Sequence, residues 1–376
     1  MVELQKSSIF SPDLSSVTKD EKPTYYLMLK DTPLMKVKGA DVEVLNRGLL
    51  PIEIRGKSDI GYDDFSDWLR DRVLPLQREH AKDLLNGLGL SQQDRKSVAL
   101  ACKGLSLIDC YWVRKGEEDK WANVNLFDNK FSEAVGRLAF TGSSKISVRG
   151  KFHTPELTGQ GAYAKCWKEV DGKLYLYKSN TPTGFESEAE YAVSNLLEAA
   201  GIPHVTYELL EHEGRIASRC ETLTNHDVMI VPAANVCAFF MNQKRDWVEQ
   251  VKMYWREEFY QMLVIDYIID NKDRHFFNWG FYFKSDTGEV LGLHPLFDHN
   301  CAMQFKQQHF SQMFDGKTMR QVARVHYRKL EDKSFVKRMR DYLDNPKVKK
   351  EFKKLFKSDL QWTKVKERCD ELLSLD

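Results

Sequence analysis

The segment Asp270–Phe281, DNKDRHFFNWGF, gathers carboxylate, amide, guanidinium and imidazole side chains between two apolar runs. Asp273 and Asn278 are five positions apart, and Asp298 follows after two short runs of strand character that are joined by a turn. Phosphoryl transfer from ATP requires a carboxylate at the acceptor hydroxyl and oxygen ligands that hold Mg²⁺ on the phosphates. The spacing is that of the catalytic loop and metal segment of protein kinases. We therefore predict Asp273 as the catalytic base, with Asn278 and Asp298 as metal ligands.

A second group of residues lies upstream, in a β-rich part of the chain. Lys178 ends the strand-like run LYLYK, and Glu190 lies on the helix that follows. In kinases a strand lysine and a helix glutamate form the ion pair that positions the α/β-phosphates. Before them, TGQGAYAK on a candidate strand–turn–strand carries Gly159 and Gly161, which let backbone N–H groups approach a phosphate. The order of these features along the chain predicts a nucleotide-binding lobe followed by a catalytic lobe.

The sequence resembles the HipA-like kinases, which are bacterial serine/threonine kinases of toxin–antitoxin type with a divergent protein-kinase fold. The resemblance covers roughly residues 150–300 and is carried by N-K-D-R-H-F-F-N at Asn271–Asn278, H-P-L-F-D-H-N, TGQGAYAK with its final Lys165, Lys178, and E-Y-A-V-S-N-L-L-E-A-A-G-I at Glu190–Ile202. It implies an α+β bilobal kinase fold with an additional N-terminal module.

The resemblance also implies an activity and the residues that carry it. The expected reaction is Mg²⁺-dependent transfer of the γ-phosphate of ATP to a serine or threonine of a protein, with Lys178 and Lys165 among the nucleotide-binding residues. The adenine hinge is expected near residues 219–222, which makes Glu221 a nucleotide-binding candidate. In this family the phosphate loop can carry a hydroxyl residue that autophosphorylates and ejects the loop, and counting back from Lys165 places Thr158 at that position. A partner antitoxin that binds DNA is implied as well.

Changes of composition and periodicity divide the chain into three parts. We expect a mixed α/β module over residues 1–140, a β-rich lobe over 141–245 and a helical lobe over 246–376. The clearest single element is a helix over Glu186–Ala200, because Gly201 gives it a C-terminal stop.

Four further segments have definite expectations. Residues 1–22 are polar and are expected to form a loose arm. Residues 64–88 have helical spacing that Pro75 should kink or split. Residues 107–113 and 146–149 look like short strands.

Composition limits the remaining classes of function. The chain has 376 residues, 42% of them hydrophobic, and a formal net charge of +1, so no global field favours nucleic acid and direct contact with DNA is not expected. Its 7 cysteines form no C-x-x-C pair, which fits a reducing compartment. No apolar run is long enough to span a bilayer, and the N-terminus lacks a signal core. We expect a cytoplasmic bacterial protein, and secretion as an effector stays open.

Three alternative functions compete with a protein kinase. D-R-H-x-x-N also resembles the catalytic loop of phosphoinositide kinases, and a basic helix over 346–357 with an apolar face could serve as a membrane-facing surface. A metallohydrolase would use several residues of the same region as ligands to a transition metal, namely Asp273, His275, His294, Asp298 and His299. In the kinase interpretation His275 instead supports the catalytic loop. A pseudokinase would bind nucleotide without turnover.

Trp112 and Trp121 are interpreted as core or docking aromatics.

Overall fold

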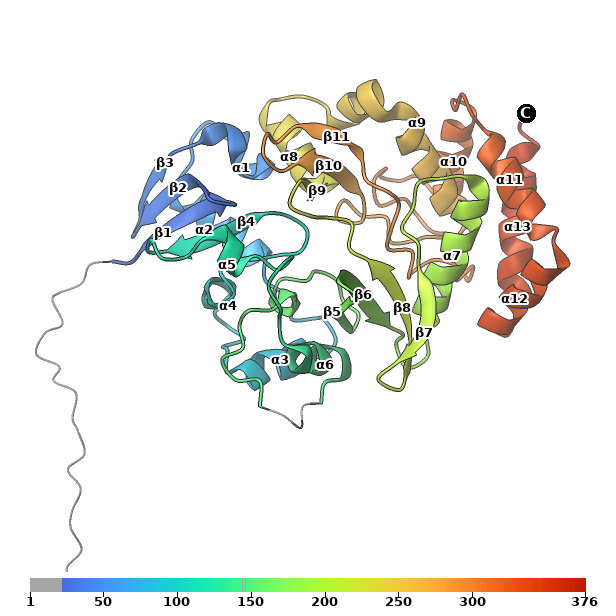
Figure 1. Ribbon diagram of the computed structural model, residues 1–376. Helices are drawn as coiled ribbons and strands as arrows, with labels where there is room; N and C mark the ends of the chain where they lie inside the picture. Colours follow the sequence, from blue (N-terminus) through green and yellow to red (C-terminus); the bar gives the residue numbers. More distant parts are fainter. Residues whose placement is uncertain (1–21, 144, 146) are drawn as a thin grey trace, which may run out of the picture.

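The computed structural model describes residues 22–143, 145 and 147–376 (Figure 1). The expected N-terminal arm lies outside these residues except for Lys22, and so does Ile146 of one expected strand. Residues 147–149 of that strand form no strand, because the chain turns there and the Lys151 N–H donates to the Val148 carbonyl at 3.1 Å.

The first part of the chain is built on an antiparallel sheet in the order β3-β2-β1-β4. Its strands are β1 (Thr24–Leu29), β2 (Thr32–Lys38), β3 (Asp41–Val44) and β4 (Tyr111–Lys115). The helices of this part are η2 (Arg47–Leu49), α1 (Ile52–Arg55), α2 (Tyr62–Asp71), α3 (Ala81–Leu88), α4 (Arg95–Ala101), α5 (Trp121–Val124) and α6 (Glu133–Thr141). The long helical segment is split as predicted, because Pro75 lies in the loop between α2 and α3. The strand expected over 107–113 begins later, at Tyr111, because Leu107 and Ile108 instead contact the chain near β9. Trp112 and Trp121 are buried, as predicted for core aromatics.

A second antiparallel sheet, in the order β5-β6-β8-β7, packs beside helix α7 (Figure 1). It follows the short helix η3 (Pro155–Leu157) and consists of β5 (Lys165–Val170), β6 (Lys173–Ser179), β7 (Glu208–His212) and β8 (Arg215–Glu221). Helix α7 spans Glu186–Ala200 as predicted. It ends at Gly201, whose φ of 69° lets its N–H bond the carbonyls of Glu198 and Leu197.

The third sheet, β9-β10-β11, consists of β9 (Val228–Pro232), β10 (Gly280–Lys284) and β11 (Val290–Leu293). Helices α8 (Ala233–Asn242) and α9 (Trp247–Ile268) contact it. Gly280 is required here because a Cβ at this position would lie 2.3 Å from the Val231 carbonyl oxygen. Since β9 pairs with β10, we propose that the boundary between the two predicted lobes lies within residues 222–227 rather than at 245.

Four helices complete the chain: α10 (Met319–Tyr327), α11 (Ser334–Leu343), α12 (Pro346–Phe356) and α13 (Leu360–Leu373). Helix α12 is the basic helix of the lipid-kinase alternative. Val348 and Phe352 are buried, and Leu355 and Phe356 pack against the core. The apolar face of α12 is therefore part of the protein interior and offers no membrane-binding surface.

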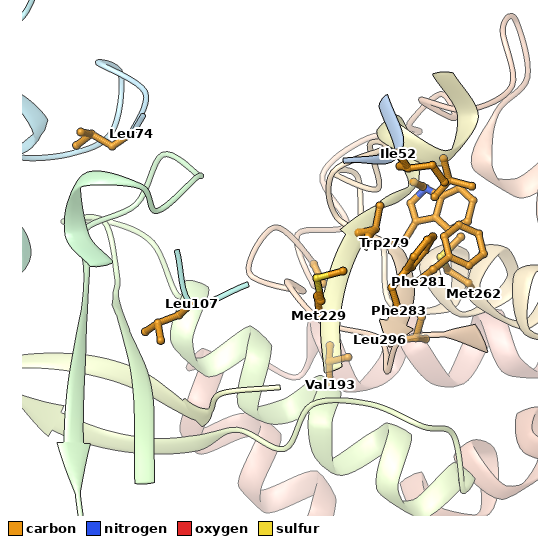
Figure 2. Packing of buried hydrophobic residues seen from close by; sticks show 14 of the residues in the cluster. Ile52, Leu74, Leu107, Val193, Met229, Met262, Trp279, Phe281, Phe283 and Leu296 are labelled. Atoms are coloured by element: carbon orange, nitrogen blue, oxygen red, sulfur yellow. The ribbon is translucent and has the colours of Figure 1, made fainter. Parts of the chain in front are cut away.

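The main hydrophobic core extends from the first sheet to the C-terminal helices and includes the buried side chains of the third sheet. Figure 2 shows Trp279, Phe281 and Phe283 from the β10 segment beside Met262 of α9. All four side chains are at most 2% exposed, and the Trp279 and Phe281 rings lie 5.9 Å apart. Burying such side chains stabilises the fold by roughly 1.5–3 kcal/mol each. Trp279 directly follows Asn278, so this packing fixes one end of the polar segment.

Candidate active site

Strand pairing in the second sheet aligns three polar residues. Lys178 on β6 is directly opposite Lys165 on β5 and opposite Ser218 on β8. Residues opposite each other in antiparallel strands project from the same face of the sheet. The register therefore places both lysines and Ser218 side by side, facing helix α7.

Lys178 connects the second sheet to the segment that ends in Asp298. Its Nζ donates to Glu190 Oε1 on α7 at 2.6 Å and to Asp298 Oδ1 at 2.7 Å. The Ser218 hydroxyl donates to the other oxygen of Glu190, which is fully buried. The order Lys, Glu, Asp inferred from the sequence thus corresponds to a contiguous cluster in space.

Burial and neighbouring charges shift the pKa of each member of this cluster, and burial raises that of Glu190. Burial alone would lower the pKa of Lys178, but Asp298 and Glu190 raise it well above its usual value. Burial alone would raise the pKa of Asp298, yet Lys178 and Lys165 lower it to about 2. Lys178 thus contacts two carboxylates at once, one on α7 and the other at Asp298.

Arg274 anchors the polar segment that contains Asp273 and Asn278. Its guanidinium is 4% exposed and bonds Asp266 of α9, with Nε and Oδ2 3.0 Å apart. The same group donates to the backbone carbonyls of Asn278 and of Phe297, the latter at 3.1 Å. Arg274 therefore ties the segment containing Asp273 and Asn278 to the segment that ends in Asp298.

Asp273 and Asn278 lie on one turn of this segment. The Asn278 side-chain nitrogen donates to the Asp273 carbonyl at 2.9 Å. Gln312 approaches the Asp273 carboxylate, with Nε2 3.4 Å from Oδ1. His275 accepts a hydrogen bond from the Phe277 N–H at 3.2 Å, which fits its predicted role as a loop support.

The oxygens at this site suit a hard divalent cation. The hydrogen bond made by Asn278 engages its amide nitrogen and leaves the amide oxygen to accept a ligand. The hydrogen bond from Lys178 engages Asp298 Oδ1 and leaves Oδ2. One amide and one carboxylate oxygen match the donors that Mg²⁺ takes beside phosphates and water.

The glycine loop leads directly into β5 and reaches the same site. It follows the helix η3, so the first strand of the expected strand–turn–strand is wrong, whereas the second is present as β5. Gly161 has φ 94°, a conformation that L side chains rarely adopt. The Tyr163 hydroxyl lies 3.2 Å from Cys301 Sγ, so the loop contacts the segment just after Asp298.

Lys165 and Thr158 lie at the two ends of this loop. Burial, followed by repulsion from Arg78 and Lys178, lowers the pKa of Lys165 to about 7. The Thr158 hydroxyl is buried and donates to the Leu105 carbonyl at 2.7 Å. Modification of Thr158 therefore requires the loop to leave this position, and its autophosphorylation stays a prediction.

Glu221 is separate from this cluster in its contacts. It ends β8, and its carboxylate forms an exposed ion pair with Lys173 at 2.9 Å. The Thr222 N–H pairs with the Leu174 carbonyl. The nucleotide role of Glu221 stays a prediction. Glu221 is the last residue of β8, directly before the connection to β9.

Sequence reasoning missed Arg274, Asp266 and Ser218. Asp266 interrupts the apolar run MLVIDYII, and a charge in a buried helix requires a partner. That was the available signal for the Arg274–Asp266 pair. Ser218 had no such signal, because its position depends on strand register.

The transition-metal alternative predicts a cluster of ligands that the structure does not form. Among residues 22–143, 145 and 147–376, no group of three or more His, Cys, Asp or Glu side chains is arranged to hold a metal ion. Burial lowers the pKa of His294 to about 4 and that of His299 well below its usual value. Both are buried histidines that pack the segment around Asp298.

Comparison with solved structures places this geometry in a known fold. HipA of Shewanella oneidensis MR-1, solved with HipB and its operator DNA, superposes with a TM-score of 0.59 at 12% identity, covering 93% of this chain and 98% of HipA. The chain has a HipA-like fold. The proinflammatory kinase CtkA of Helicobacter pylori matches 57% of this chain and 89% of its own at 15% identity, with a TM-score of 0.43. No protein-family model and no curated protein matches the sequence.

The HipA-like fold extends beyond the segment that carries the sequence resemblance. The part of the chain left uncovered by HipA is much shorter than residues 1–140. Most of the N-terminal module therefore belongs to the shared α+β fold.

Proposed function

We propose that this protein is an ATP- and Mg²⁺-dependent serine/threonine protein kinase. The observation that carries the proposal is the contact of Lys178 with both Glu190 and Asp298, at 2.6 and 2.7 Å. The Lys178–Glu190 pair corresponds to the strand-lysine–helix-glutamate ion pair that positions nucleotide phosphates in kinases, and the contact with Asp298 brings the predicted metal segment next to it. The HipA-like fold supports the same assignment.

Each residue of the cluster has a distinct task in the proposed reaction. Asp273 accepts the proton of the acceptor hydroxyl. The hydroxyl oxygen forms a bond to the γ-phosphorus, and the bond between that phosphorus and the β-phosphate oxygen breaks, so that ADP leaves. Lys178, braced by Glu190, binds the α/β-phosphates, and Lys165 with the glycine loop covers them. Most of the rate gain is then expected from positioning and charge stabilisation.

Asn278 and Asp298 are the residues that would hold Mg²⁺. When bound, the ion neutralises charge on the phosphates. The contribution of the chain is to orient these two oxygens, which Arg274 achieves by fixing both backbone segments.

The proposal is tested by transfer of labelled γ-phosphate from ATP to protein, with peptide mapping of the products. We expect phosphoserine or phosphothreonine on the protein itself or on an added protein substrate, dependent on Mg²⁺. Mapping also tests Thr158 as an acceptor. Nucleotide binding without any transfer to the protein or to a panel of protein substrates would indicate a pseudokinase and contradict the proposal.

Asp298→Asn is expected to weaken Mg²⁺-dependent nucleotide binding by at least about tenfold, because a charged metal ligand becomes neutral. Titration calorimetry with a non-hydrolysable ATP analogue, with and without Mg²⁺, measures the effect. The magnesium-free affinity of the variant should not fall. An unchanged magnesium response would show that Asp298 is no metal ligand.

Binding of nucleotide at about pH 8 is expected to take up protons, because phosphates should raise the low pKa of Lys165 and restore its charge. Below about pH 6 the lysine is already protonated in the free protein, so uptake should vanish. Calorimetry in buffers of different ionisation enthalpy measures the uptake. Lys165→Met should abolish it, and equal uptake in this variant would contradict the assignment.

A protein partner forms part of the proposal. The HipA structure contains HipB and operator DNA from a toxin–antitoxin system. By analogy we propose an antitoxin partner for this chain in the bacterial cytoplasm, with any DNA contact made through that partner. Among the described residues, no helix combines the length and apolar character needed to cross a membrane.

A further inference from the structure

The glycine loop is held by the N-terminal module at several points. The Leu74 N–H donates to the Leu157 carbonyl at 2.8 Å, and the Glu79 N–H donates to the Ala162 carbonyl at 2.8 Å. From the loop side, Gln160 Nε2 donates to the Asp71 carbonyl at 2.8 Å. The loop is therefore attached at several points to a part of the chain outside both kinase lobes.

Arg78 is the buried centre of this attachment. It lies between α2 and α3, and its side chain and that of Glu156 are each 1% exposed. One guanidinium nitrogen donates to the Glu156 carbonyl at 3.1 Å, and the other donates to Glu156 Oε2 at 3.2 Å and to the Lys165 carbonyl at 2.7 Å. The rigid guanidinium thus links Glu156, two positions before the loop begins at Thr158, to Lys165, which ends it.

The partner carboxylate reinforces the same geometry. Glu156 Oε1 accepts the Trp167 N–H on β5 at 2.7 Å. A Cβ added at Gly159 would lie 3.1 Å from an Arg78 nitrogen, so the loop backbone packs directly on the guanidinium. Arg78 and Glu156 together fix both the entrance of β5 and the path of the loop above it.

We propose that Arg78 is a positioning residue for the nucleotide, and that the N-terminal module is thereby part of the nucleotide site. The proposal rests on the proposed kinase function for its nucleotide. Arg78 does not touch phosphate; it holds the Lys165 backbone and the glycine loop in the shape that receives phosphate. Pre-ordering this loop reduces the entropy lost on binding.

The test compares two double variants that each neutralise a buried ion pair whose arginine lies in the N-terminal module. Arg78→Met/Glu156→Gln removes the guanidinium, while the amide oxygen of the new side chain can still accept the Trp167 N–H, which avoids an unpaired buried charge. The control is Arg72→Met/Asp109→Asn, since Arg72 pairs with Asp109 at 2.8 Å and donates to the Gly104 carbonyl, outside residues 155–165. Both are compared with wild type at a temperature where all are folded.

We expect the Arg78 variant to raise KM for Mg-ATP by about tenfold or more, with a smaller change in kcat. Without Arg78 the glycine loop is no longer ordered in the free protein and must become ordered when nucleotide binds. Arg78→Lys should recover part of the loss. Hydrogen exchange without nucleotide should show faster exchange over residues 158–165 in the Arg78 variant only.

Two results would overturn the proposal. One is a folded Arg78 variant whose KM for Mg-ATP and whose exchange protection over residues 158–165 equal those of wild type. The other is an Arg72 control that changes both quantities as much as the Arg78 variant does. Exchange needs no activity, so it separates this proposal from the kinase assignment. If wild type neither binds nor uses ATP, the proposed function fails and the nucleotide role of Arg78 fails with it, whatever the exchange shows about the loop.

Discussion

Asp273→Ala is expected to lose phosphoryl transfer by about 10²–10⁴-fold in kcat, because a positioned general base contributes that much to proton transfer. Its affinity for Mg-ATP should stay close to that of wild type, since Asp273 contacts the acceptor and not the phosphates in the proposed reaction. Steady-state kinetics and calorimetry on the same preparation measure the two quantities.

The matched control for this variant is His275→Ala, two positions away on the same half-buried turn. The His275 side chain accepts a hydrogen bond from the Phe277 N–H, and its Nε2 lies 3.9 Å from Asp273 Oδ2, which is beyond hydrogen-bond distance. Its loss should therefore reduce kcat much less. Full activity of Asp273→Ala, or an equal loss in both variants, would show that Asp273 is not the base.

Arg274→Met is expected to lower the free energy of unfolding by about 3–5 kcal/mol, because it leaves the buried Asp266 carboxylate without its cation. The substitution also removes the donor that joins the Asn278 and Phe297 carbonyls. Activity should therefore fall even where the variant is folded. Chemical denaturation followed by tryptophan fluorescence measures the loss.

The comparison variant is Arg274→Met/Asp266→Asn, in which the unpaired buried charge is also removed. It should recover part of the stability, since a neutral amide can still accept from Asn271 Nδ2, which donates to Asp266 at 2.8 Å in the native structure. It should not recover activity, because the two carbonyls still lack their donor. A loss below about 1 kcal/mol in Arg274→Met would contradict the role assigned to this pair.

Local patterns predicted the elements that carry the site. Helix α7 was predicted with its bounds, because helical spacing and the stop at Gly201 are properties of the sequence nearby. The order of Lys178, Glu190 and Asp298 along the chain was enough to suggest one cluster. In protein kinases, residues of these types in this order lie together in space, although they are far apart in the sequence.

What the sequence could not predict depends on pairing between distant segments. Strand β9 was missed, and its partner β10 lies about fifty positions away, across two helices. Ser218 reaches Glu190 only through the register of β6 and β8. Arg78 looked like any surface arginine, and only the packing of the N-terminal module under the glycine loop buries it.

The most direct test of the central claim is calorimetric titration of Mg²⁺ and a non-hydrolysable ATP analogue into wild type, Lys178→Met and Lys173→Met. Lys173 lies on the same strand, but its ion pair with Glu221 is exposed, so it serves as the control. We predict one site in wild type and in Lys173→Met, and at least about tenfold weaker binding in folded Lys178→Met, where the charged donor to phosphate is lost. Absence of binding in wild type, or undiminished binding in Lys178→Met, would contradict the account.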